Sequence, residues 1–362
     1  MHVALLVNGA FLHEERATLE HLVVGLMDEG VGVVQVLPDG RSEDDICRFG
    51  DVVTWRDTSW GLMWRLRISE LANELGKLNV NVVHALDNRL WQPAIALATR
   101  MDIPAVLSAW SYADTRRCDG MRRAVRAGRA GFVAPNGPLA TAIIERLNLD
   151  AVVEVIPPGV HLADVEAAEP DEQPSALVTA SGTMDENYDA LFRAIKAVIA
   201  DHPTAHFFLD GRDNDQHSLW QPIKQYDLNA NTSMVPKRLP HHDLLRSAEA
   251  LIEPQAQGRY RTLSLEAMAH GLPVLAREDP WIDHFMEDQN AWVVDGPDAQ
   301  RWEKLIRRVI EKPDRAQELG KRARQWIANN RLAAGYVVQT LELYRRVTGE
   351  SMRFPQAQAA GE

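Results

Sequence analysis

Four polar residues gather around the start of one predicted helix, where they could bind an anion. In the stretch GRYRTLSLEAMAHG, Arg259, Arg261 and Thr262 precede or open the helix, and Glu266 lies inside it. The first N–H groups of a helix have no partner within the helix, and the helix dipole makes that end positive, so it attracts phosphate. A guanidinium can add two parallel hydrogen bonds to phosphate oxygens. These residues predict a phosphate site; the alternative is that Arg259 and Arg261 are two solvated arginines on a surface loop.

The position of Glu266 on the helix suggests a role for its carboxylate. On a helical wheel Glu266 falls between Thr262 and His270, whereas Leu265 and Met268 point toward the core. The carboxylate then lies on the same face as the helix start. The alternative is an exposed glutamate that only favours the first turn.

The elements that would position this helix alternate along the chain. An apolar run at 2–7 is followed by a helical pattern at 15–30 and by a second apolar run at 31–38. This order is typical of parallel βαβ units. Further strands are predicted at 80–86, 103–110, 175–181, 205–211, 249–254 and 272–276, and further helices at 61–78, 91–101, 187–202 and 241–248.

The chain of 362 residues is long enough for two domains, each with its own core. Prolines, a glycine and acidic residues replace the periodic pattern in VIPPGVHLADVEAAEPDEQP. We therefore predict an α/β protein of two Rossmann-like, doubly wound parallel-sheet domains facing across a cleft, in which ligands bind beyond the carboxyl ends of the strands. The expected bounds are 1–160 for the first domain, 161–174 for the linker, 175–335 for the second domain, and 336–362 for a helix crossing back to the first domain and a loose tail.

Three segments of the sequence resemble the retaining glycosyltransferases of GT-B fold, family 4. VVEVIPPGVHLADV looks like the interdomain segment of that family, LPHHDLLRSAEALIEPQ like the helix and strand before its donor site, and LEAMAHGLPVLA like that site itself. The resemblance implies transfer of a sugar from a nucleotide-activated donor, with retention, to an acceptor of glycan or glycolipid type. It also implies that Glu266 accepts hydrogen bonds from the nucleotide ribose. Because such chemistry needs no dedicated protein nucleophile, we assign no catalytic residue.

The sequence departs from the family pattern at the donor site. A first glutamate of the family is replaced by Gly258, and its phosphate-binding Arg and Lys by Ser181 and Glu186. A histidine of the first domain is replaced by Trp110, and the paired glycines after the first strand are missing. Loss of one preorganised donor at such a centre costs about 2.7 to 4 kcal/mol of transition-state stabilisation.

Two interpretations of the donor site follow from these departures. In one, Arg259 and Arg261 restore the missing charge, and Thr262, Ser181, Gly182 and Glu266 complete the donor site of an active transferase. In the other, the chain is a catalytically inactive homologue that acts as a sugar- or nucleotide-binding module or as a partner subunit of an active transferase.

Four residues of the first domain are candidates for the cleft and the acceptor. Asn8 and Gly9 follow the first predicted strand, His84 ends a later one, and Trp110 ends another. Strand ends at the cleft would place these side chains near a ligand. A histidine with satisfied hydrogen bonds is the alternative for His84, and core packing is the alternative for Trp110.

Charge and composition limit the possible partners and cofactors. The net charge of −12 argues against broad nucleic-acid binding. Six arginines between Arg116 and Arg129 could contact an anionic membrane, although arginines on a plain solvated helix are an alternative. No metal site is predicted, because His241 and His242 are adjacent on a helix and lack a partner one turn away, and no cofactor is predicted. The N-terminus lacks a basic start and a cleavage site, so we expect a cytoplasmic protein, peripheral at most at the inner face of the membrane.

Overall fold

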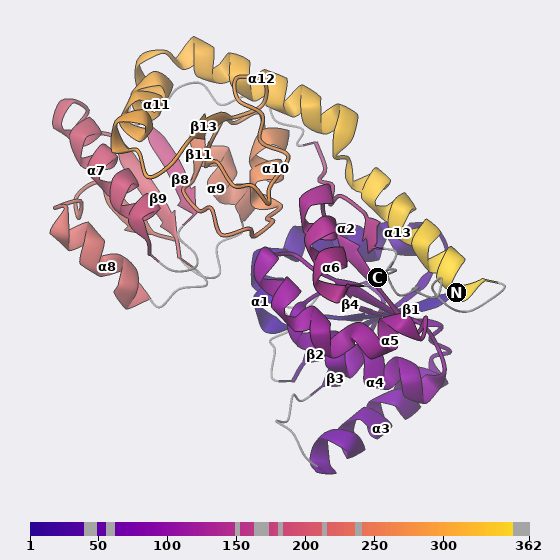
Figure 1. Cartoon of the computed structure of the whole chain (residues 1–362). Coiled ribbons are helices and arrows are strands. Elements are labelled where there is room, and N and C mark those ends of the chain that lie inside the picture. The colour runs from indigo at the N-terminus through magenta and orange to yellow at the C-terminus, as the bar shows by residue number, and fades with distance from the viewer. Residues whose placement is uncertain are drawn as a thin grey trace. The chain divides into compact units, whose positions relative to one another are not determined.

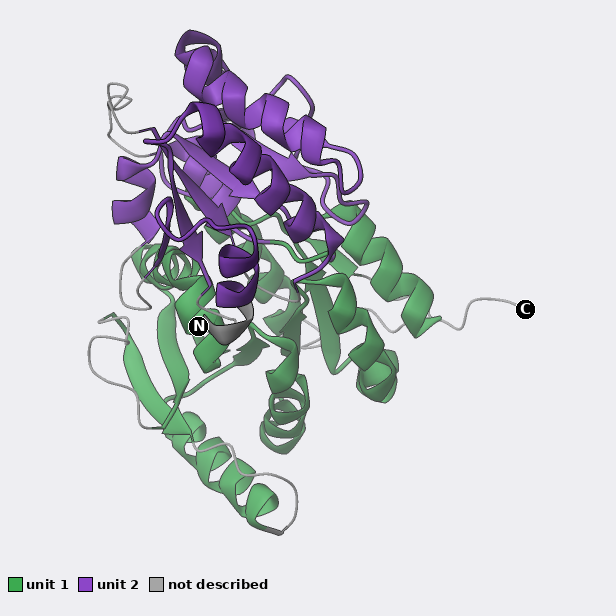
Figure 2. Cartoon of the chain, turned by 90° about the vertical axis from the view of Figure 1, so that its left-hand side faces the viewer, with its two compact units in different colours: residues 1–159, 258–260, 333–362 green, residues 160–257, 261–332 purple. Residues whose placement is uncertain are grey.

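The computed structural model describes residues 1–39, 49–55, 62–148, 153–162, 174–179, 184–211, 216–235 and 241–349. The chain divides into two compact units, which are described separately (Figure 2). Unit 1 comprises Met1–Gly159, Gly258–Tyr260 and Ala333–Glu362, and unit 2 comprises Val160–Gln257 and Arg261–Leu332. Of the four residues of the predicted anion site, Arg259 therefore belongs to unit 1, whereas Arg261, Thr262 and Glu266 belong to unit 2.

Unit 1 contains a sheet of seven parallel strands in the order β3-β2-β1-β4-β5-β6-β7. The strands are β1 (His2–Leu6), β2 (Gly32–Pro38), β3 (Asp51–Trp55), β4 (Val82–Ala85), β5 (Ala105–Ser108), β6 (Ala130–Ala134) and β7 (Val153–Val155). The strand order reverses between β1 and β4, so the segments that follow these two strands diverge at the carboxyl edge of the sheet. Such a switch point is where open α/β sheets bind ligands.

The helices of unit 1 pack on both faces of this sheet (Figure 1). They are α1 (Gly9–Glu14), α2 (Arg16–Asp28), α3 (Leu62–Lys77), η2 (Asn88–Leu90), α4 (Trp91–Met101), η3 (Tyr112–Met121), α5 (Arg122–Arg126), α6 (Gly137–Leu147) and α13 (Ala333–Thr348). Helix α13 packs on α2, and its buried Val337 and Tyr344 join the core that β1 and α2 form. The last described helix therefore completes the hydrophobic core of unit 1.

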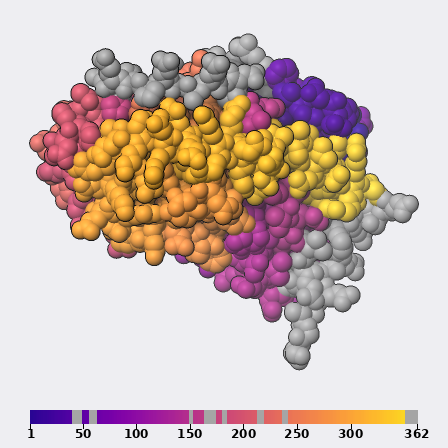
Figure 3. Space-filling view, turned by 90° about the horizontal axis from the view of Figure 1, so that it is seen from above, coloured from indigo at the N-terminus to yellow at the C-terminus, as the bar shows by residue number. Residues whose placement is uncertain are grey.

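Unit 2 contains a second parallel sheet, with six strands in the order β10-β9-β8-β11-β12-β13. The strands are β8 (Ser175–Thr179), β9 (His206–Asp210), β10 (Thr232–Met234), β11 (Ala250–Glu253), β12 (Val274–Arg277) and β13 (Trp292–Val294). The helices are α7 (Glu186–Asp201), α8 (Gln216–Gln225), α9 (His241–Ser247), α10 (Leu263–Ala269), α11 (Ala299–Glu311) and α12 (Pro313–Asn330). Figure 3 shows α11 and α12 in shades of orange over one face of this unit.

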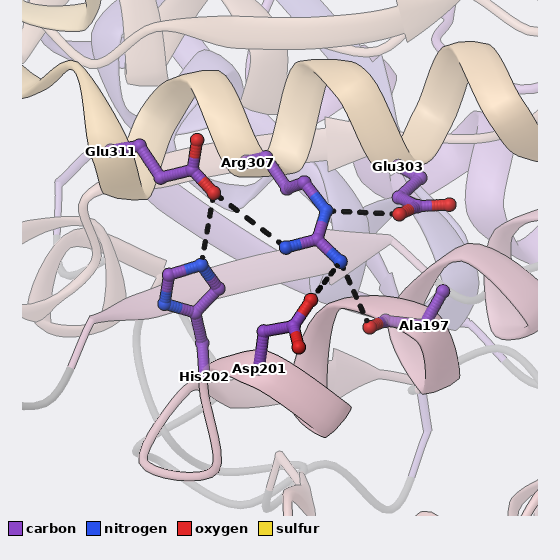
Figure 4. Close-up of polar contacts among 6 residues, drawn as sticks. All are labelled: Ala197, Asp201, His202, Glu303, Arg307 and Glu311. Atoms are coloured by element: carbon purple, nitrogen blue, oxygen red, sulfur yellow. Dashed lines mark hydrogen bonds and ion pairs between the residues drawn. The ribbon is translucent and has the colours of Figure 1, made fainter.

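A polar cluster joins α7 to α11 at the surface of unit 2 (Figure 4). The Arg307 guanidinium donates to Asp201 at 2.7 Å and to Glu303 at 2.9 Å, and these bonds raise the pKa of Arg307. Glu311 lies 3.6 Å from Arg307 and 3.1 Å from His202. Because the cluster is solvent-accessible, it adds little stability, and the apolar contact between the two helices holds them together.

The predicted α/β fold with two parallel Rossmann-like sheets is confirmed. Helix α4 spans the predicted 91–101, and most other predicted elements shift by one to three residues at their ends. The sequence did not predict β3, β6, β7, β10 or β13, and the last three are only three residues long. Strands this short show no usable periodicity.

A close backbone contact fixes the end of α10 in unit 2. Helix α10 ends at Ala269, and the chain turns at Gly271, whose φ of +77° is a left-handed conformation that favours glycine. Gly320 of α12 lies so close that a Cβ there would overlap the carbonyl oxygen of Gly271. Backbone atoms cannot move aside as a flexible side chain can. Glycine at position 320 therefore allows α10 and α12 to pack this closely.

Replacing Gly320 by alanine should destabilise unit 2. We expect G320A to lower the free energy of opening of α10 and α12 by about 1 to 3 kcal/mol, because the added methyl group overpacks the contact. Hydrogen exchange of peptides from α10 and α12, read by mass spectrometry, measures this change. The control is G335A in α13, where a Cβ would meet nothing within 4 Å. Unchanged exchange in G320A would contradict the close contact.

Candidate functional site

Polar residues end the central strands of unit 2 at the carboxyl edge of the sheet. Asp210 ends β9, Glu253 ends β11 and Arg277 ends β12. Asp210 bonds His241 at 2.8 Å, and Arg277 donates to the Asn187 side chain at 3.1 Å. The strand order reverses between β8 and β11, so this edge has the topology of a ligand site.

Helix α10 begins at this edge and carries Glu266. Thr262 precedes the helix, and its hydroxyl lies 3.5 Å from Oε1 of Glu266, at the long limit of a hydrogen bond. Glu266 is half-buried, whereas Leu265 and Met268 are fully buried. The predicted orientation of the two apolar side chains toward the core is confirmed, whereas Glu266 is less buried than they are and Thr262 is fully buried.

Arg261 belongs to a buried polar cluster in unit 2. Its exposure is only 9%, and its charge acts on the carboxyl group of Glu253, which is 6% exposed. Ser264 donates to the backbone oxygen of Arg261 at 3.2 Å, and its side chain also bonds Glu253. The alternative that Arg261 is a solvated arginine on a surface loop is therefore wrong.

Burial controls the protonation of Glu253. Desolvation raises the pKa of this carboxyl to about 7, the Arg261 charge opposes the rise, and the charge of Asp279 adds to it. Near neutral pH, Glu253 is therefore poised between a neutral and an ionised form. The sequence alone does not single out Glu253, because a glutamate at the end of an apolar strand has no signature until the fold shows its burial.

Arg259 belongs to unit 1 and is already paired there. Its guanidinium forms an ion pair with Glu14, and the exposed fractions of the two side chains are 36% and 12%. The backbone of this segment bonds to unit 1 as well, since Tyr260 N–H donates to the Trp110 oxygen at 2.7 Å. Gly258, the position of the missing glutamate, adopts a φ of +66° that favours glycine.

The remaining donor-site candidates lie at the start of α7 or before it. Ser181 and Gly182 lie outside the described residues. Glu186 is exposed in the first turn of α7, and the Asp185 side chain caps the helix by accepting from Asn187 N–H at 3.0 Å. Two carboxylates therefore stand at this helix start, where the family pattern has a cation.

His84 is buried within unit 1. It is 1% exposed, its Nε2 lies 2.7 Å from the Ser108 hydroxyl, and its Nδ1 bonds the Tyr344 hydroxyl. Burial lowers the pKa of His84 to about 3, so the imidazole is neutral. Both ring nitrogens form hydrogen bonds within the protein. The geometry therefore supports the alternative interpretation, in which His84 is a histidine with satisfied hydrogen bonds and not a ligand-binding residue.

Asn8, Gly9 and Trp110 lie at the carboxyl edge of the unit 1 sheet. The Asn8 side chain caps α1 by accepting from Phe11 N–H at 2.8 Å, and Gly9 is the first residue of that helix. The Trp110 ring packs edge-on against Phe11, with ring centroids 5.3 Å apart. Asn8 and Trp110 therefore have structural contacts that explain their positions without a ligand.

The arginine-rich segment from Arg116 to Arg129 is not one plain helix. It spans part of the 3-10 helix η3, the short helix α5 and the turn that follows. Five of its six arginines are exposed, and Arg122 is half-buried. The segment therefore presents its positive charge on the surface of unit 1.

The described part of the chain contains neither a metal-binding cluster nor a membrane-spanning helix. There, no group of three or more His, Cys, Asp or Glu side chains is arranged to hold a metal ion. Among the described helices, none combines the length and the apolar character that a membrane span requires.

Solved structures share the fold of the whole chain. A glycosyltransferase from Rickettsia africae is 15% identical, with 97% of this chain and 99% of that chain covered and a TM-score of 0.76. Anabaena HepE in complex with UDP and glucose is 14% identical, with coverages of 96% and 100% and a TM-score of 0.75. TarM of S. aureus, solved as a mutant in complex with UDP, is 9% identical, with coverages of 95% and 99% and a TM-score of 0.73. The protein therefore has the GT-B fold.

Part of the chain is similar in sequence to a known protein family. Residues 163–326, which make up most of unit 2, match the model of the glycosyl transferases group 1. No curated protein sequence matches the chain. The matched segment contains Glu253, Arg261 and Glu266, so these residues lie in the part of the chain that is similar to that family.

The raised pKa of Glu253 predicts how its replacement changes stability with pH. Between its usual value of 4.5 and about 7, the folded protein holds a proton that the unfolded chain releases, so this contribution to stability is lost as pH rises. From pH 5 to pH 8, we expect the stability of E253Q relative to the parent protein to rise by about 2 to 3 kcal/mol. Urea unfolding at several pH values measures the difference.

The matched control for this measurement is E278Q, which replaces an exposed glutamate next to β12. Its stability relative to the parent should stay constant with pH. Equal pH dependence of the two variants would contradict the protonation of Glu253 in the folded protein.

Proposed function

We propose that this protein transfers a sugar from a nucleotide-activated donor, with retention of configuration, and that unit 2 binds the donor. The match of residues 163–326 to the group 1 glycosyl transferases is the observation that carries this proposal. The complexes of HepE with UDP, with UDP and glucose and with UDP-glucose support a nucleotide-sugar as the ligand class.

In this proposal the donor lies at the carboxyl edge of the unit 2 sheet, at the start of α10. Glu266 binds the ribose, and Thr262 and the free N–H groups after it face the diphosphate. Arg261 supplies positive charge, and its charge interacts with the buried carboxyl of Glu253. Ser181 and Gly182 belong to the same proposed site, and no metal or cofactor takes part.

The acceptor is proposed to be a glycan or a lipid-linked molecule bound by unit 1. The exposed arginines between Arg116 and Arg129 would hold the protein at the inner face of an anionic membrane. This location suits an acceptor that carries a lipid.

A non-catalytic binding module or partner subunit is the second candidate, and two observations favour it. Arg259 is paired with Glu14, so one of the two replacement cations already has a partner. Glu186 and Asp185 stand at the start of α7, where carboxylates repel a diphosphate. Under this alternative the protein binds a nucleotide or sugar but does not break the glycosidic bond.

Calorimetric titration with UDP, GDP and their sugars tests the proposal directly. We expect one of these nucleotides to bind, and R261A to weaken its binding by at least about tenfold, the loss expected for a charged hydrogen bond. Because Arg259 is paired with Glu14, R259A should have a smaller effect. Absence of binding to every nucleotide would exclude the donor site.

R301A is the control for these titrations, since Arg301 pairs with Glu287 on the outside of unit 2 and should not affect binding. Hydrolysis or transfer of the bound donor, measured in the same samples, separates the two candidate functions. Binding without turnover, with or without acceptor extracts, would support the binding module.

A further inference from the structure

A groove in unit 1 lies outside the site described above. We call it the unit 1 groove; it has a volume of about 580 Å³ and runs between α4 and the segment around α5, with Trp64 of α3 at one side. Pockets of this volume hold molecules of small-ligand size. Its apolar wall includes Trp64, Ile95, Ala96 and Met121, and its positive wall includes Arg123 and Arg129.

The charge around the groove is positive, although the whole protein carries −12. No residue that lines the groove is acidic, and Arg116, Arg117 and Arg126 are exposed nearby in the sequence. The acidic Asp119 of the same segment is paired with Arg146 at 2.6 Å. The local excess of positive charge therefore selects an anionic ligand.

Helix α3, which supplies Trp64 to the groove, also carries exposed apolar side chains. Met63 is 57% exposed and Leu66 is 50% exposed, and both lie in the first two turns of α3, next to Trp64. Arg65 is exposed between them. Helix α3 packs on α4, which forms the groove wall (Figure 1). Exposed apolar residues interleaved with arginine are typical of helices that lie in a membrane interface.

We propose that the unit 1 groove binds one acidic phospholipid of a membrane surface. The lipid phosphate bonds Arg123 and Arg129, and an acyl chain lies along Ile95, Ala96 and Met121. Met63 and Leu66 enter the interface between neighbouring lipids. The combination of an apolar wall with two arginines favours a lipid over a free phosphate, which has no apolar part to bury.

This inference deepens the proposed membrane contact and rests on it, but it does not depend on the donor site. Nucleotide binding by unit 2 and lipid binding by unit 1 are separate measurements. Failure of the nucleotide titrations would overturn the donor site and leave the groove unaffected.

Vesicle binding by the full-length protein tests the groove. We expect cosedimentation with vesicles of equal parts phosphatidylglycerol and phosphatidylcholine, and little with phosphatidylcholine alone. R123Q/R129Q should weaken binding about thirtyfold, because each arginine near the surface contributes roughly fivefold. R116Q/R117Q loses the same charge outside the groove lining and should weaken binding less than tenfold.

A variant that fills the groove without changing charge gives a second measurement. A96F places a phenyl ring in the groove and should weaken vesicle binding about tenfold, with circular dichroism unchanged as the check of folding. Equal loss in the two arginine pairs together with no loss in A96F would overturn the groove in favour of diffuse surface charge.

Competition identifies the ligand. Dihexanoyl phosphatidylglycerol below its micelle concentration should displace the vesicles at a concentration at which glycerol 1-phosphate does not. Equal displacement by glycerol 1-phosphate would overturn the lipid and identify a phosphate site. Equal binding of phosphatidylcholine vesicles would overturn the selection for negative charge.

Discussion

In both sheets of this protein every described strand runs in the same direction, so each connection must cross a face of the sheet. The carboxyl ends of the strands then meet along one edge, and the strand order reverses once in each sheet. At the reversal, the segments that follow the two neighbouring strands lead to opposite sides of the sheet, which leaves room for a ligand between them. Asn8 in unit 1 and Glu253 in unit 2 both lie at such reversals. The parallel pairing of the strands therefore determines where each unit can bind a ligand, which is at the carboxyl edge of its sheet.

Burial shifts the pKa values of a histidine in unit 1 and a glutamate in unit 2 in opposite directions. In unit 1, His84 is fully enclosed, its pKa is lowered to about 3, and its bonds to Ser108 and Tyr344 join the sheet to α13. In unit 2, Glu253 is also buried, and desolvation raises its pKa to about 7 although the Arg261 charge opposes the rise. A neutral histidine with two partners contributes to packing, whereas a carboxyl beside a buried arginine can hold that arginine toward a ligand.

The arginines of this protein differ in burial and in the groups that they contact. Arg261 is buried at the proposed donor site, and Arg259 is held by Glu14 in unit 1. The exposed arginines between Arg116 and Arg129 lie on the surface of unit 1, two of them beside an apolar groove. These exposed arginines give this part of unit 1 an attraction for anions, although the whole protein carries a net charge of −12.

The sequence by itself determined the alternation of strands and helices, the two-domain α/β fold and the segment that contains α10. These features depend on local periodicity and on neighbours in the chain, so they can be read from spacing alone. The helical spacing also placed Leu265 and Met268 in the core. Strands of three residues escaped prediction because they span less than two periods.

Only the tertiary structure decided what each polar residue contacts. His84 and Tyr344 are 260 positions apart, and Arg259 pairs with Glu14, which lies near the start of the chain. It also decided that Arg261 is buried, and that Trp64, Ile95 and Arg123 line one groove. Such contacts join segments that are distant in sequence, and burial and pKa depend on all the groups that surround a side chain, so neither can be derived from local spacing.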